Sequence, residues 1–129
     1  MNKETQVEIW EVETPSADPD GPEQWRIIEG FVRYECSSLG RFRRVGKHYL
    51  KGSPNHNGYT HIGMMPDGST KQDFRLAHRI IAATFIPKPL TDKYLVVNHR
   101  NGKRGDNRVS NLEWATIRHN NTEWRHRKN

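Results

Sequence analysis

The chain has 129 residues, 33% of them hydrophobic, so it can bury one compact core or form two small units that share one. Its single cysteine, Cys36, excludes an internal disulfide and leaves no cysteine pair for a structural zinc site. No apolar run is long enough for a membrane helix, and no apolar signal segment follows Met1. We therefore expect a soluble, intracellular protein with no membrane partner and no structural zinc, in which Cys36 is a small buried side chain on a strand.

Charge is distributed unevenly along the chain. Residues 1–35 carry nine acidic side chains and three basic ones, whereas residues 36–129 carry six acidic and eighteen basic ones. A basic body of this kind favours nucleic-acid binding, although a basic surface kept for solubility is the simpler alternative. The acidic front is either a solubilising flank or a shield for the basic surface when DNA is absent.

Short alternating segments predict strands in the first half of the chain. Val7–Val12 alternates like a strand, and the Pro- and Asp-rich stretch 15–22 indicates an exposed loop. Antiparallel strands without long crossovers predict a meander of three or four strands. Further strands are expected over residues 31–36, 41–45 and 59–64, with turns at 38–40 and 66–69 and a polar loop at 47–57.

The second half of the chain changes to helical spacing and then to a hairpin. Residues 76–85 predict a helix, which Pro87 ends. Residues 94–98 and 112–115 predict two strands joined by a turn-rich loop, and Thr116 caps a C-terminal helix. The fold class is therefore α+β. We expect a small antiparallel β unit with its acidic flank over residues 1–70, and a unit of helix, hairpin and C-terminal helix over residues 71–129.

One histidine and two asparagines stand in a pattern that suits phosphodiester chemistry. Asn111 and Asn120 follow His99 by twelve and twenty-one residues, within a basic segment that contains glycine. Histidine is the side chain best suited to accept a proton near neutral pH, and asparagine offers a neutral oxygen to a hard divalent cation. Together with the excess of Lys and Arg, these residues indicate cleavage of a phosphodiester backbone.

An ordered series of short motifs carries a resemblance to a known family. The series comprises His-Arg-Ile at 78–80, Phe-Ile-Pro at 85–87, Asn-His at 98–99, Asn-Leu-Glu-Trp at 111–114 and Asn-Asn at 120–121. It resembles the HNH endonucleases of the ββα-metal fold, and among them the phage and intron-encoded homing endonucleases. Upstream, residues 35–43 and Gly58-Tyr59 are similar to the small modular unit that often precedes this nuclease. The likeness covers roughly residues 27–123.

The resemblance implies roles for the motif residues. His99, held at the surface by a strand end beside a loop, would be the general base, and Asn111 would brace the loop and orient it. Asn98 and Asn120 would hold one divalent cation, Mg²⁺ or alternatively Mn²⁺. Many family members have Asp where this chain has Asn98. A site without a protein carboxylate should bind the cation weakly until DNA supplies negative charge.

Other residues receive supporting roles. His78 is expected to be structural or to support the site from beneath the hairpin, and Asn121 is an alternative to Asn120 as a cation ligand. Asp106 is better explained by turn formation than by metal binding. Trp114 is expected in the core. Two basic clusters would contact DNA phosphates. They are Arg100, Lys103, Arg104 and Arg108 in the nuclease loop, and Arg41, Arg43, Arg44 and Lys47 upstream.

The leading hypothesis is a metal-dependent DNA endonuclease of a nicking or homing type, from a phage or mobile element, acting on double-stranded DNA in the cytoplasm of a phage-infected bacterium. The alternative is a catalytically impaired DNA-binding protein that retains the fold, and Asn98 is the residue that favours it. A third possibility, an RNA-binding module, would need the pattern of exposed aromatic residues that such modules use for base stacking, and the sequence does not have that pattern. The sequence leaves open whether the chain acts alone, as a homodimer or with a phage protein partner.

Overall fold

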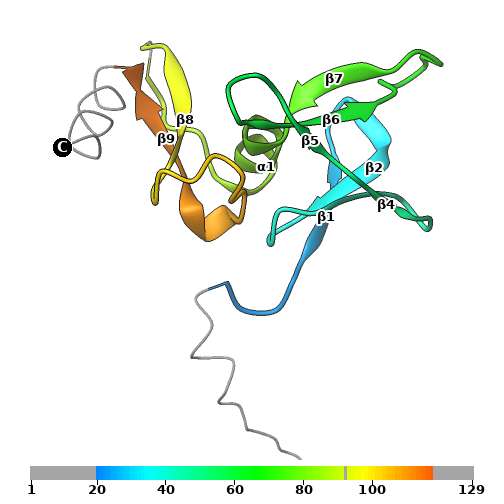
Figure 1. Cartoon of the computed structure of the whole chain (residues 1–129), viewed down its shortest axis with the longest axis horizontal. Helices are drawn as coiled ribbons and strands as arrows, with labels where there is room; N and C mark the ends of the chain where they lie inside the picture. Colours follow the sequence, from blue (N-terminus) through cyan, green and yellow to red (C-terminus); the bar gives the residue numbers. More distant parts are fainter. Residues whose placement is uncertain (1–19, 92, 118–129) are drawn as a thin grey trace, which may run out of the picture.

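The computed structural model describes residues 20–91 and 93–117. The expected strand Val7–Val12 and the C-terminal helix with Asn120 and Asn121 lie outside the described residues. Within the described part, three antiparallel sheets and one α-helix form an α+β fold, as predicted (Figure 1). No helix in this part is long and apolar enough to cross a lipid bilayer.

The first sheet has four strands in the order β1-β2-β3-β4, each antiparallel to the next. Cys36 pairs with Phe42 across β2 and β3, and both side chains are buried, so this side of the sheet faces the core. Cys36 is thus a buried strand residue, as predicted. The strands span Trp25–Ile28 (β1), Phe31–Ser37 (β2), Phe42–Arg44 (β3) and Tyr49–Leu50 (β4).

A second sheet has the order β5-β6-β7, and its buried residues are Ile62 and Met64. The predicted antiparallel meander is present as the first sheet, but the strand expected at 59–64 belongs to this second sheet. The polar segment 47–57 contains two strands of only two residues each, which belong to different sheets and have no alternation long enough to detect. The strand β7 was also missed. The second sheet comprises Ser53–Pro54 (β5), Thr60–Met64 (β6) and Asp73–Leu76 (β7).

The helix α1 spans Ala77–Phe85 and follows β7 directly, with Leu76 as its N-cap residue. It ends at Ile86, whose extended backbone (φ −111°, ψ 118°) is the conformation that a following proline favours. Periodicity therefore predicted this helix to within one residue. The side chains that α1 buries lie on one face. They are Ala77, His78, Ile81 and Ala82.

A hairpin completes the described chain. Its strands are β8 (Leu95–His99) and β9 (Leu112–Thr116), which pair in antiparallel fashion, and the short 3₁₀ turn η2 (Val109–Asn111) precedes β9. The register places Asn98 opposite Glu113 and His99 opposite Leu112. Both strands agree with the sequence prediction to within one residue at each end.

One hydrophobic core joins all of these elements. The helix α1 lies between the β8–β9 hairpin and the two larger sheets, and it contacts strands of all three (Figure 1). Trp114 is half-buried against this core, and its indole N–H donates to the carbonyl of Ile86 over 3.0 Å. The core draws on the first sheet, the second sheet, the helix and the hairpin, for example through Phe42, Met64, Ile81, Val97 and Leu112.

Candidate active site

His99 is the last residue of β8, and only 4% of its surface is exposed. The expectation that it sits at the surface was wrong, because the rings of Tyr59 and His78 pack against it. Its Nε2 lies 2.8 Å from Oδ1 of Asn107, which can only accept a hydrogen bond. Nε2 is therefore the protonated nitrogen, and Nδ1 carries the lone pair that can take a proton.

Asn107 is a site residue that the sequence analysis missed. It is 6% exposed and lies in a loop, where no periodic pattern marks a buried side chain. Its position is set by the β2–β3 turn: a Cβ added to Gly40 (φ +90°) would meet the carbonyl carbon of Asn107 at 3.0 Å. Beside it, the backbone N–H of Val109 donates to the carbonyl of Ser38 over 2.9 Å. The first sheet therefore supports the residue that orients His99.

Asn111 closes the same loop from the other side. Its Oδ1 accepts from the backbone N–H of Asn101 over 3.0 Å, and its Nδ2 donates to the Asn101 side chain and to the carbonyl of Asp106. Its own carbonyl accepts from the backbone N–H of Arg100 over 2.8 Å. These bonds tie both ends of the loop to η2, so Asn111 braces the chain on both sides of the segment that follows His99.

Two rings, those of Tyr59 and His78, pack beside the general-base candidate. His78 of α1 lies 4.8 Å from Tyr59 and 5.0 Å from His99, measured between ring centroids. Burial, together with the nearby charges of His99 and Arg79, lowers the pKa of His78 to about 4. Its buried Nδ1 has no hydrogen-bond partner within the described residues. At neutral pH His78 is therefore uncharged, and it presents a neutral ring to His99.

Asn98, the residue before His99 on β8, has a different set of neighbours. It is 3% exposed, and its Nδ2 donates to Oε2 of Glu113 across the two strands, over 2.8 Å. The other carboxylate oxygen of Glu113 lies 3.3 Å from a guanidinium nitrogen of Arg100. The sequence predicts a cation site without a carboxylate ligand, and the structure adds a carboxylate one hydrogen bond away from Asn98. The pair of Asn98 and Glu113 could not be predicted from the sequence, because it depends on the register of the β8–β9 hairpin.

These residues fit a hard divalent cation better than a zinc ion. Within residues 20–91 and 93–117 no three His, Cys, Asp or Glu side chains converge to hold a metal. Burial raises the pKa of the Cys36 thiol to about 11, so it is protonated at neutral pH. A carboxamide oxygen beside one carboxylate suits Mg²⁺, which keeps several waters and shares phosphate oxygens. Asn120 and Asn121 lie outside the described residues.

Several of the arginines expected to contact DNA have carboxylate partners within the protein. Arg41 forms two hydrogen bonds to Glu23, at 2.6 and 2.8 Å, and Arg43 lies 2.6 Å from Glu35. Arg43 also stacks on the Trp25 ring at 3.7 Å. In contrast, no ion pair between described residues involves three of the expected contacts. These are Arg44, Lys47 and Lys103.

The nuclease loop shows the same mixture. Arg104 donates to the carbonyl of Asn57 over 2.5 Å and lies over the Tyr59 ring. Arg108 pairs with Asp106 at 2.8 Å and with Asp20 at 3.1 Å. Its hydrogen bond is the main reason why the pKa of Asp106 falls to about 2. Asp106 is thus held as a structural carboxylate inside the loop.

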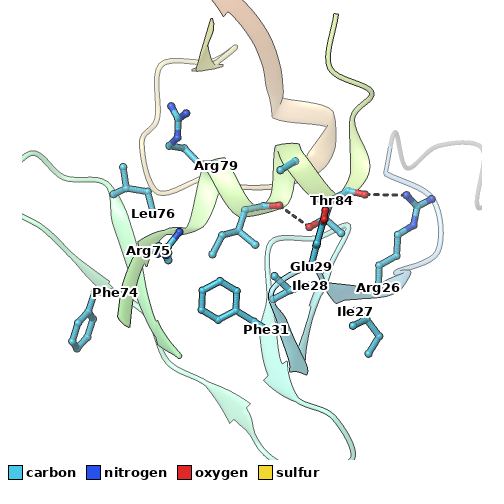
Figure 2. Close-up of a pocket in the computed structure, with 12 residues that line it drawn as sticks. Arg26, Ile27, Ile28, Glu29, Phe31, Phe74, Arg75, Leu76, Arg79 and Thr84 are labelled. Atoms are coloured by element: carbon cyan, nitrogen blue, oxygen red, sulfur yellow. Dashed lines mark hydrogen bonds between the residues drawn. The ribbon is translucent and has the colours of Figure 1, made fainter. Parts of the chain in front are cut away.

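A cavity of about 640 Å³ lies between α1 and the strands β1 and β7, and Figure 2 shows residues that line it. Arg79 and Ile80 line it, and they occupy the helix face opposite the buried His78 and Ile81. At its edge, Arg26 donates to the carbonyl of Thr84 over 3.2 Å. The cavity is therefore separate from the cluster around His99.

Two family models match the chain. A model described as HNH endonuclease matches residues 75–122, which include α1 and the hairpin, and the NUMOD4 motif matches residues 23–64, which include the first sheet. Two uncharacterized HNH endonucleases of Acanthamoeba polyphaga mimivirus are 34% and 35% identical over 72% and 75% of this chain. The matches span only 23% and 28% of those two proteins.

A phage relative has a solved structure. The DNA endonuclease I-HmuI of Bacillus phage SP01 is 32% identical over 72% of this chain and 52% of its own length. A structure titled "DNA binding and cleavage by the HNH homing endonuclease I-HmuI" superposes with a TM-score of 0.70 and 28% identity. That superposition covers 81% of this chain and 59% of the solved chain. The chain therefore matches only part of each relative.

Proposed function

We propose that this chain is a metal-dependent DNA endonuclease of the HNH type that hydrolyses phosphodiester bonds, because a model described as HNH endonuclease matches residues 75–122 and the chain is similar to a phage DNA endonuclease in sequence and structure. One observation carries the proposal: Nε2 of His99 lies 2.8 Å from Oδ1 of Asn107. The residue that precedes His99 in the chain is Asn98, whose carboxamide is buried. That arrangement pairs an oriented general base with an oxygen suited to a divalent cation.

In the proposed reaction Nδ1 of His99 takes a proton from a water molecule. The water oxygen forms a bond to the scissile phosphorus, and the bond from phosphorus to the 3′ oxygen breaks, with its electron pair leaving on that oxygen. A divalent cation, Mg²⁺ or Mn²⁺, held by Asn98 and Asn120 would neutralise charge on the phosphate and on the departing oxygen. Asn107 and Asn111 keep the base and its loop in place during this step.

We propose double-stranded DNA as the partner, in a phage-infected bacterial cell, with a nicking or homing role. One site serves one phosphodiester, so a monomer would nick one strand, whereas cutting both would need a second subunit, a phage protein partner or a second binding event. The division into units 1–70 and 71–129 is part of this proposal. The second candidate is a DNA-binding protein without catalysis, which Asn98 favours because the family resemblance places Asp there.

Plasmid nicking with and without Mg²⁺ tests the proposal. The wild-type chain should convert supercoiled plasmid to the open circular form only when Mg²⁺ or Mn²⁺ is present, and His99→Ala should not. Plasmid binding without nicking by the wild type, at any divalent cation concentration, would support the DNA-binding alternative. Nicking that proceeds equally in the presence of EDTA would remove the cation from the proposal.

A further inference from the structure

Glu113 stands opposite Asn98 on β9, and both of its carboxylate oxygens are engaged: Oε2 by Nδ2 of Asn98 at 2.8 Å, and Oε1 by Arg100 at 3.3 Å. We propose that Glu113 is a positioning residue that orients the carboxamide of Asn98 and adds a fixed negative charge beside the cation site. This inference rests on the proposed function, because it assumes that Asn98 serves a cation.

The orientation follows from the chemistry of an amide. The two edges of a carboxamide are nearly the same size, so an asparagine side chain can present either its oxygen or its NH₂ group to a neighbour. A carboxylate accepts hydrogen bonds and repels an oxygen, so Glu113 selects the NH₂ edge of Asn98. The carbonyl oxygen, which is the atom that can bind a cation, is thereby held at the other edge. Arg100 in turn fixes Glu113.

The position of Glu113 also places a negative charge close to a cation bound by Asn98. A neutral asparagine contributes no countercharge to a bound cation, whereas a carboxylate one hydrogen bond away contributes a full negative charge at short range. With the screening typical of a partly exposed site, that charge alone should strengthen cation binding roughly tenfold. The side chain of Glu113 is 24% exposed, and that of Arg100 is 59% exposed, so water screens the guanidinium more than the carboxylate.

The pairing of Asn98 with Glu113 predicts the effect of exchanging the carboxamide and the carboxylate between these two positions. Asn98→Asp would place a second carboxylate against Glu113, with a like charge where the wild type has a hydrogen bond. Adding Glu113→Gln restores the pair with its polarity reversed, because the glutamine NH₂ group can donate to the new carboxylate. The double variant N98D/E113Q has the net charge of the wild type, so it tests the pairing and not the number of charges.

The experiment measures Mn²⁺ binding by electron paramagnetic resonance to the full chain on a DNA duplex, with Mn²⁺ binding by duplex alone subtracted. All variants carry His99→Ala so that the duplex stays intact. Glu113→Gln should weaken Mn²⁺ binding about tenfold, and Glu113→Ala, which also loses the orientation, by about 10–100-fold. N98D/E113Q should bind Mn²⁺ within about threefold of the Asn98-Glu113 chain. Asp73→Asn, which removes a charge from an exposed pair with Arg75, should change nothing.

Two further variants separate the inference from the proposed function. Asn98→Ala should also weaken Mn²⁺ binding. If it does so while both Glu113 variants bind Mn²⁺ normally, Glu113 has no positioning role and the inference is wrong. If Asn98→Ala itself binds Mn²⁺ like its parent, the cation site of the proposed function fails first. Circular dichroism of Glu113→Gln, which keeps an acceptor for the Asn98 amide, checks that weakened binding does not reflect unfolding.

Discussion

Two consecutive residues of β8 have different electrostatic surroundings, a neutral side at His99 and a charged side at Asn98. On the neutral side, the described neighbours of His99 include two rings and the amide oxygen of Asn107. On the other side Asn98 lies beside a carboxylate that is paired with a guanidinium. A nearby positive charge makes a base a weaker proton acceptor, whereas a bound cation needs negative charge close by. Two consecutive residues of one strand therefore have the two environments that the proposed reaction needs.

The largest expected effect is on the neutral side. His99→Ala should slow plasmid nicking by about 10²–10⁴-fold, because a general base acts in the transition state. Affinity for the same duplex, measured in EDTA by fluorescence anisotropy, should stay within a few fold. Retained nicking in His99→Ala would take this histidine out of the mechanism and leave the comparison between the two sides without a catalytic meaning.

A smaller effect is expected when His99 keeps its ring but loses its orienting partner. Asn107→Ala should lower kcat by roughly 10–100-fold with little change in KM, because the ring is misplaced but still present. Asn107→Asp keeps an acceptor oxygen and should recover much of the rate. Asn57→Ala, an exposed loop asparagine, serves as the control. Equal rates for Asn107→Ala and the wild type would mean that the 2.8 Å bond does not set the working geometry.

The parts of the site that depend on local sequence patterns could be predicted. The parts that depend on contacts between residues distant in sequence could not. Residues 76–85 and the two hairpin strands were found to within one residue because each has its own periodicity. The burial of His99 was missed because it comes from Tyr59 and α1, which are distant in sequence. Glu113 belongs to the Asn-Leu-Glu-Trp motif that the sequence shows. Its contact with Asn98 could not be predicted, because it depends on the register of a hairpin with a long loop.

The buried, uncharged His78 beside His99 should also make the free energy of unfolding depend on pH. Because burial lowers the pKa of His78 to about 4, the unfolded chain takes up a proton at this position between pH 6.5 and 4 while the folded chain does not. The free energy of unfolding should therefore fall as the pH drops through that window, by an amount on the order of 3 kcal/mol from this residue.

Thermal unfolding of variants isolates that contribution. His78→Phe keeps a ring beside Tyr59 and His99 but cannot be protonated, so its Tm should fall less than that of the wild type between pH 6.5 and 4. His56→Phe changes an exposed histidine and should follow the wild-type curve. Parallel curves for the wild type and His78→Phe would show that His78 is protonated in the folded chain and that the pocket of His99 is not neutral.

The smallest effect concerns DNA affinity and separates paired from unpaired cations. Roughly four to eight phosphate contacts predict that log K falls with log[salt] at a slope of about −4 to −7. Lys103 forms no ion pair within the described residues, so Lys103→Ala should make the slope shallower by about 1. Arg100 already faces Glu113, so its loss should release fewer counterions and change the slope by less. Duplex titrations over a range of salt concentrations measure both slopes. An equal change for the two variants would show that Arg100 leaves Glu113 for phosphate on binding, and that the charged side of the hairpin reorganises around DNA.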